Sequence, residues 1–144
     1  MTNNTHTSAW LEPIQYPLAN KFIREHSFRG RIRSDDECMV MRNSQSEIIA
    51  VAALRPVDGE KLLTAVAVAP SFQGQGVVKQ LLRDMSQSFS DQTYTFALDH
   101  LVGLYERSGF DIVSDEQLSS EMSSRLEAYR KQGRQITPMR YIPA

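Results

Sequence analysis

One stretch constrains the fold of this chain more than any other, because an apolar run enters a glycine-containing turn and then an amphipathic helix. Residues 66–69 read Val-Ala-Val-Ala, and the turn after Pro70 contains Gly74 and Gly76. The following apolar residues recur with a helical period, namely Val78, Leu81, Leu82, Met85 and Phe89. We therefore expect a buried strand followed by a helix of about 13–14 residues, as in an α/β sheet.

Other segments supply the rest of the sheet. A helix is expected at residues 17–26, and strands are expected at residues 39–42, 47–57 and 62–69, the last two as a hairpin. Further on, a strand at 93–98, a short helix at 101–108 ending at Gly109 and a strand at 110–113 follow. Ser114 and Gln117 resemble a capping box before a helix that ends at Gly133, and residues 136–142 form a last strand. The pattern predicts one α/β (α+β) domain over residues 1–144 with a mixed sheet, and residues 1–9 are expected to be a flexible tail.

Composition excludes several classes of function. The 16 Lys and Arg residues nearly balance the 17 Asp and Glu residues, so a nucleic-acid or membrane-surface binder is not expected. The first ten residues are polar, and no apolar run approaches the ~20 residues of a membrane span, so we expect a cytoplasmic protein. Cys38 is the only cysteine, which excludes a disulfide and a cysteine-rich metal site, and we expect it to be a buried hydrophobe. We expect no metal ion.

The glycine turn indicates an anion site. The first N–H groups of a helix lack partners within the helix, and glycine lets an oxyanion approach them closely. Two nucleotide-binding motifs do not fit: Gly76 is followed by Val77 and Val78 instead of Lys and Ser or Thr, and Lys79 stands at the third position of G-x-G-x-x-G. A phosphate site and an ordinary strand-to-helix turn remain open.

Two motifs together resemble the GNAT acetyltransferases. The family pattern V-x-P-x-[YF]-[RQ]-[GR]-x-G-[IVL]-[GA] is matched by Val68, Pro70, Phe72, Gln73, Gly74, Gly76 and Val77. Val78 departs from it, because the family has Gly or Ala there. Residues 104–110, Leu-Tyr-Glu-Arg-Ser-Gly-Phe, are similar to the family's LYE-x-x-GF segment. The resemblance implies the GNAT fold, a mixed and mostly antiparallel sheet of 6–7 strands with about 4–5 helices and a splayed strand pair forming the acetyl-CoA cleft.

The resemblance also implies which residues bind acetyl-coenzyme A. Val66, Ala67 and Val68 would hold the pantetheine arm, with the Val68 amide as the candidate donor to the thioester oxygen. Backbone N–H groups of the turn would bind the pyrophosphate, and these belong to Gln73, Gly74, Gln75, Gly76, Val77 and Val78. Lys79 and Arg83 either screen phosphate charge or form a solvated helix face.

Tyr105 corresponds to the family tyrosine that protonates the departing thiolate. The strand at 62–69 has no Glu before Val68 to serve as the base, which leaves His100 as the candidate and Asp99 as a weaker one, since Asp99 also suits a helix N-cap. Arg24, Arg29, Arg31 and Arg33 lie where the family covers its acceptor, but Asp35, Asp36 and Glu37 follow them, so a self-neutralising surface loop is the favoured interpretation.

The predicted activity is transfer of an acetyl group from acetyl-CoA to a primary amine of a small molecule, amino acid or peptide, by direct attack in a ternary complex. The alternative is a non-catalytic acyl-CoA-binding or regulatory module on the same fold. No nucleic-acid or membrane partner is expected, and a homodimer is a possible assembly.

Overall fold

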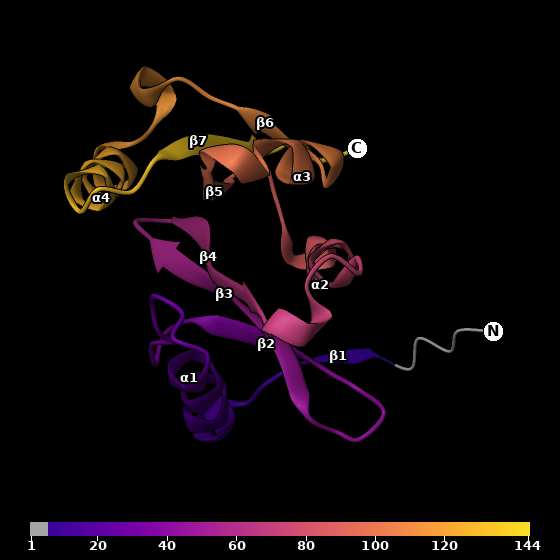
Figure 1. The fold of residues 1–144 in the computed structure, drawn as a ribbon. Helices are drawn as coiled ribbons and strands as arrows, with labels where there is room; N and C mark the ends of the chain where they lie inside the picture. The colour runs from indigo at the N-terminus through magenta and orange to yellow at the C-terminus, as the bar shows by residue number, and fades with distance from the viewer. Residues whose placement is uncertain (1–5) are drawn as a thin grey trace. The chain divides into compact units, whose positions relative to one another are not determined.

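The computed structural model describes residues 6–144 as seven strands and four α-helices (Figure 1). The strands form one sheet in the order β1-β2-β3-β4-β5-β7-β6, in which β4 and β5 are parallel and the other pairs with assigned registers are antiparallel. The strands are β1 (Thr7–Trp10), β2 (Glu37–Arg42), β3 (Ile48–Val57), β4 (Glu60–Val68), β5 (Thr93–Leu98), β6 (Phe110–Ile112) and β7 (Ile136–Tyr141). The helices are α1 (Tyr16–Glu25), α2 (Val77–Met85), α3 (Val102–Arg107) and α4 (Ser120–Lys131). This mixed, mostly antiparallel sheet confirms the predicted fold class.

The chain divides into two compact units, and β3 and β4 each contribute to both. The first contains the residues up to Arg55 and Thr64–Gln87, and the second contains Pro56–Leu63 and Ser88–Ala144. The β3–β4 hairpin turns at Asp58 and Gly59, both left-handed, which matches the twist of paired strands. The single domain over residues 1–144 stays a prediction.

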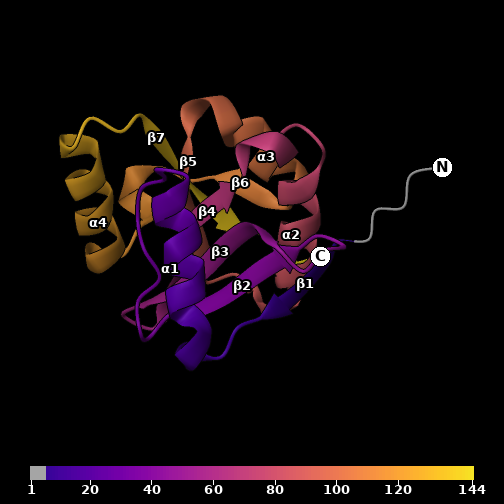
Figure 2. The same ribbon diagram turned by 60° about the horizontal axis from the view of Figure 1, so that its bottom comes forward.

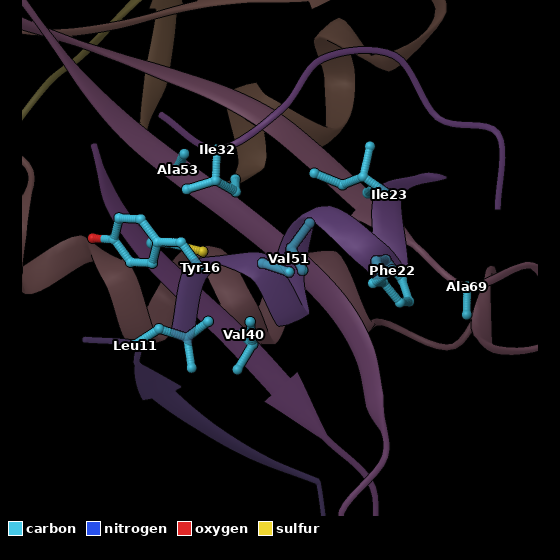
Figure 3. Packing of buried hydrophobic residues seen from close by; sticks show 12 residues of the cluster. Leu11, Tyr16, Phe22, Ile23, Ile32, Val40, Val51, Ala53 and Ala69 are labelled. Atoms are coloured by element: carbon cyan, nitrogen blue, oxygen red, sulfur yellow. The ribbon is translucent and has the colours of Figure 1, made fainter. Parts of the chain in front are cut away.

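In the first unit, α1 covers one face of β2 and β3. Strand side chains alternate between faces, so Cys38 and Val40 of β2 share a face with their neighbours Val51 and Ala53 of β3. They pack with residues of α1, including Phe22, in one buried cluster (Figure 3). Figure 2 shows α1 lying across these strands.

The opposite face of β2 carries α2. Met39 and Met41 are buried there, and α2, which contacts β2, buries Leu81, Leu82 and Met85. Figure 1 shows α1 and α2 on opposite sides of β2. Both faces of this part of the sheet are therefore covered, which explains why its strands have continuous apolar sequences.

Polar side chains fix the connection between α1 and β2. The Asn20 side chain donates to the Ile32 carbonyl at 3.1 Å and accepts from the Ile32 N–H at 2.7 Å. Arg55 binds both carboxylate oxygens of Asp36, at 3.0 and 2.9 Å, and its Nη2 also donates to the Arg31 carbonyl. Because both charged side chains are buried, removal of one would leave the other uncompensated.

In the second unit, β7 lies between β5 and β6, and α4 packs against side chains of β5. Tyr94 and Phe96 of β5 share a cluster with Met122 and Tyr129 of α4. The Ser119 hydroxyl accepts from the Met122 N–H and caps α4. The α3 helix packs against β6 and β5.

Several predicted boundaries were wrong. Thr7–Ala9, expected in a flexible tail, belong to β1 and pair with β2, whereas residues 1–5 of that prediction lie outside the described residues. Helix α2 ends at Met85, and Ser86 begins a 3-10 turn in which its hydroxyl donates to the Arg83 carbonyl. The capping box of Ser114 and Gln117 is present but caps the N-terminus of a 3-10 helix, Asp115–Gln117, ahead of α4.

Candidate cofactor and catalytic site

Strand β4 contains an irregularity in its middle. The pairing of β4 with β5 covers Lys61–Leu63, and two residues later Ala65 has a φ of 56°. An alanine in this left-handed conformation costs roughly 1 kcal/mol, so the surrounding structure holds it there. Thr64, Ala65 and Val66 are all half-buried, between the buried pairs Leu62–Leu63 and Ala67–Val68. The backbone of β4 is therefore redirected at the residue after Thr64.

The turn after β4 is held in place by Gln73. Its side-chain Nε2 donates to the Val68 carbonyl at 3.1 Å, which fixes the turn to the end of the strand. The Ala69 N–H donates to Ile49 of β3 at 2.8 Å, and Phe72 donates to the Ala69 carbonyl. Gln73, which stands at the Arg-or-Gln position of the motif, therefore holds the turn against the end of β4.

Gly74 and Gly76 give the turn its shape. Their φ values are 77° and 78°, a conformation that glycine adopts without strain. A Cβ atom built on either glycine would meet no atom within 4 Å among the described residues. Both glycines are thus required by backbone conformation, and both face open space.

The open side of the turn is the N-terminus of α2. Gly76 is the N-cap, and no side chain of the described residues caps it. The first hydrogen bond of the helix runs from the Gln80 N–H to the Gly76 carbonyl at 3.1 Å, so the N–H groups of Val77, Val78 and Lys79 precede it. Val77 is buried, Val78 is half-buried and Lys79 is exposed. Free amides, a positive helix end and open space fit a diphosphate.

The second motif forms a packed corner in the second unit. Tyr105 is buried in α3, and its ring meets Phe110 edge-on at 5.9 Å between centroids. Gly109 has a φ of 100°, and a Cβ there would lie 2.8 Å from the ring of Tyr141, so only glycine fits. Burial raises the pKa of Tyr105 to about 12, which keeps the phenol protonated at neutral pH.

The two candidate bases differ in their surroundings. His100 is exposed in the 3-10 turn Asp99–Leu101 that follows β5. The Asp99 carboxylate accepts from the Thr137 hydroxyl at 2.7 Å, and the Asp99 N–H donates to the Gln135 carbonyl. Asp99 is the first residue of that turn, whereas Leu98 and Leu101 hold the N-cap positions, so the N-cap role expected for Asp99 is wrong.

The first unit contains all the predicted cofactor-binding residues, and the second contains Tyr105 and His100. Sequence reasoning missed the left-handed Ala65, since no glycine marks that position. It also missed the burial of Asp36. Arg55 binds this carboxylate, so Asp36 does not neutralise Arg29, Arg31 and Arg33 as a solvated carboxylate would. Within residues 6–144, no helix is long and apolar enough to cross a membrane, and no group of three or more His, Cys, Asp or Glu could hold a metal ion.

Comparisons with known proteins show the family and the fold. Residues 14–124 match a family model described as an acetyltransferase (GNAT) domain. The fold is similar to N-acetylglutamate synthase from Neisseria gonorrhoeae, with a TM-score of 0.70 and 16% identity over 99% of this chain. It is also similar to Rv2747 from Mycobacterium tuberculosis (TM-score 0.70, 12% identity, 96% of this chain) and to a GNAT acetyltransferase from Staphylococcus aureus Mu50 (0.66, 13%, 96%).

The chain spans 36% of the gonococcal enzyme, 99% of the mycobacterial protein and 100% of the staphylococcal one. A search of curated proteins found no significant match. The fold is that of a class of acetyltransferases. The match over residues 14–124 shows that the chain belongs to the GNAT acetyltransferase family.

Proposed function

We propose that this chain transfers an acetyl group from acetyl-CoA to a primary amine in a ternary complex. The observation that carries the proposal is the turn before α2, where two left-handed glycines face open space beside amides that lack helical partners. Similar folds include the gonococcal synthase, solved with coenzyme A and N-acetyl-glutamate, and the mycobacterial protein, solved with CoA.

In the first unit, the glycine turn, α2 and the end of β4 each have a role in binding the donor. The N–H groups of residues 74–78 bind the pyrophosphate, whereas the predicted Gln73 donor is already paired, because its N–H donates to the Pro70 carbonyl at 3.3 Å. Lys79 and Arg83, both exposed on α2, add positive charge. Val66, Ala67 and Val68 hold the pantetheine arm along β4. The Val68 amide is the proposed donor to the thioester oxygen, which becomes negative as the amine attacks.

Tyr105 and His100 act on protons. His100 takes a proton from the ammonium form of the acceptor, and the free amine then attacks the thioester carbon. The carbon–sulfur bond breaks, and the leaving sulfur receives a hydrogen bond and then a proton from the Tyr105 hydroxyl. The new amide nitrogen gives up its remaining excess proton, which restores the Tyr105 hydroxyl. Because the Tyr105 pKa is about 12, full transfer to a thiolate of reference pKa about 8.5 is uphill by roughly 5 kcal/mol. We therefore infer that hydrogen bonding to the sulfur comes before proton transfer.

Calorimetry with CoA and acetyl-CoA tests the donor site directly, and absence of binding at millimolar concentration would overturn the proposal. With binding established, release of free thiol is measured against a panel of amines and amino acids. Thiol release with at least one acceptor is the expected result. Binding without release for any acceptor would instead indicate an acyl-CoA-binding module.

Tyr105→Phe separates catalysis from binding. The variant lacks only the hydroxyl, so we expect kcat to fall by about 10²–10⁴-fold, with CoA affinity by calorimetry nearly unchanged. Unchanged turnover would remove Tyr105 from the mechanism. His100→Gln is the matching test of the base, because the side-chain amide cannot accept a proton from the acceptor, so kcat should fall while CoA affinity is kept.

A further inference from the structure

Three half-buried arginines of the second unit lie in or near α4, and none has a role in the acetyl-CoA site. They are Arg125 of α4, Arg134 in the turn after α4 and Arg140 of β7. The Nε of each has almost no exposed surface and no hydrogen-bond partner in residues 6–144. Within the same residues, none of the three forms an ion pair with a carboxylate.

The end of α4 positions Arg134. Gly133, with a φ of 88°, allows the Arg134 N–H to donate to the Tyr129 carbonyl and the Gly133 N–H to donate to the Arg130 carbonyl. This Schellman motif turns the chain back, so that the Arg134 guanidinium lies 4.6 Å from the centre of the Tyr129 ring. The position of Arg134 is thus set by backbone hydrogen bonds and by a ring contact.

Arg125 and Arg140 lie on the same side of the sheet. Arg125 precedes Tyr129 by four residues and so neighbours it on the surface of α4. Arg140 pairs across the strands with Tyr94, which packs against Met122 of α4 in one cluster, so the Arg140 side chain shares that face. The Tyr129 ring in turn contacts Phe96 of β5 at 5.9 Å between centroids.

This arrangement is unfavourable as it stands. Each buried N–H without a partner loses its bonds to water, and like charges on the same side of the sheet repel. The nearest carboxylate by register is Asp111, which pairs with Arg140 across β6 and β7, is exposed and forms no ion pair among the described residues. Glu121 and Glu127 of α4 are also exposed. A bound oxyanion would satisfy the arginine donors and remove the repulsion.

We propose that Arg125, Arg134 and Arg140 bind an oxyanion of the acceptor, so that the acceptor is a small amine that also carries a carboxylate or a phosphate. The cluster lies beside the end of the β4–β5 pairing, because Phe96 directly follows Thr95, whose partner Leu63 is the last residue of β4 to pair with β5. This inference rests on the proposed acetyl transfer, but the binding of an oxyanion is measurable without it.

Matched pairs of acceptors test the substrate class. Thiol release is compared between amino acids and their carboxamides, and between ethanolamine phosphate and ethanolamine. The anionic member of at least one pair should have kcat/KM about 10- to 100-fold higher, the range expected for one or two charged hydrogen bonds. The pair that responds distinguishes a carboxylate from a phosphate. Equal rates within every pair that reacts would overturn the proposal.

Substitutions assign the effect to the arginines. In Arg134→Gln the preference for the anionic acceptor should fall at least about tenfold through KM, with kcat little changed. Lys131→Gln is the matched control, because it removes one exposed charge from the same helix and should keep the preference. Arg140→Gln is a second variant should Arg134→Gln prove unstable. Loss of affinity for CoA but not for dephospho-CoA in these variants would place the arginines at the donor instead and overturn the proposal.

A binding measurement separates this proposal from the proposed function. Inorganic phosphate is titrated into the protein, and backbone amide NMR signals of residues 125–140 are followed. Saturable shifts there, lost in Arg134→Gln and kept in Lys131→Gln, would support the site even if no acceptor were acetylated. Shifts that are absent, or unchanged in Arg134→Gln, would overturn it.

Discussion

Single side chains of this protein owe their chemistry to burial. Cys38 is 1% exposed, and burial, followed by the nearby charge of Asp36, raises its pKa to about 12. Burial alone raises the pKa of Tyr105 to a similar value. Both groups keep their protons at neutral pH, which makes the thiol inert and leaves the phenol as a hydrogen-bond donor. The buried hydrophobe predicted for Cys38 is confirmed.

Thiol labelling tests the state of Cys38. With a pKa of about 12, a fraction of only about 10⁻⁴ is thiolate at pH 8, so reaction with iodoacetamide should be slower in the folded protein than in urea by 10³-fold or more. Labelling at the same rate in both states would show that the thiol is accessible and ionised.

The same pKa shift predicts how stability changes with pH. The folded thiol binds its proton more tightly than the unfolded thiol, so its contribution is fully present below a pKa of about 9 and is lost as pH rises toward 12. The urea midpoint should therefore fall between pH 9 and pH 11. Cys38→Ala is the matched control, and its midpoint should fall less over the same interval. Identical curves for the two proteins would contradict the shift.

At the scale of elements, the turn between β4 and α2 has two features. Its glycines have a conformation that only glycine adopts easily, and the space beside them is open. Gly76→Ala should cost roughly 1–2 kcal/mol of unfolding free energy, because alanine is strained at this φ. It should also weaken CoA binding about tenfold or more, since the new methyl group occupies space beside the amides of α2. Urea unfolding and calorimetry measure the two effects.

Gly59→Ala is the control for that substitution. Gly59 has a φ of 83° and open space around it in the β3–β4 turn, so the backbone cost is similar while CoA affinity should not change. Equal loss of CoA affinity in both variants would mean that general destabilisation, and not the turn, determines binding.

The positions of helices and strands could be predicted from the sequence where the apolar period and a glycine at the end of the element indicated the same boundary. Helix α1, the β3–β4 hairpin and the strand at 93–98 lie where their patterns predicted, and Gly109 and Gly133 are left-handed as expected of helix ends. The end of α2 did not follow, because Phe89 continues the apolar period while the serine-rich chain leaves the helix after Met85. In the second unit Phe89 packs instead against Phe110 and Tyr141.

At the scale of the whole molecule, β3 and β4 pass through both compact units. Because neither strand can lose half of its pairing independently, we expect one cooperative unfolding transition. Circular dichroism and the fluorescence of Trp10, in β1 of the first unit, should give coincident urea curves. A saturating concentration of CoA, at about 100 times its Kd, should stabilise the protein by about 2.7 kcal/mol in both signals. Separate transitions would show two domains in place of the predicted one.

The candidate site was predictable in part. The motif residues 68–77 and 104–110 indicated the donor site, since free amides and glycines have a recognisable spacing. The arginines of the second unit were not predictable, because their proximity depends on a Schellman turn and on the pairing of Arg140 with Tyr94, which are separated by many residues. A homodimer stays a prediction, to be measured by sedimentation.

The position of α4 between β6 and β7 has a consequence for how relatives of this protein could change their acceptor. The residues proposed to bind the pantetheine arm and the pyrophosphate come from one uninterrupted segment, 66–83, whereas two of the three proposed acceptor arginines lie in α4 or in the turn that ends it. A relative could therefore acquire a new acceptor by exchanging about twenty residues around α4, leaving the donor segment intact. Transplanting residues 114–135 between members of this fold would be a direct way to redesign selectivity.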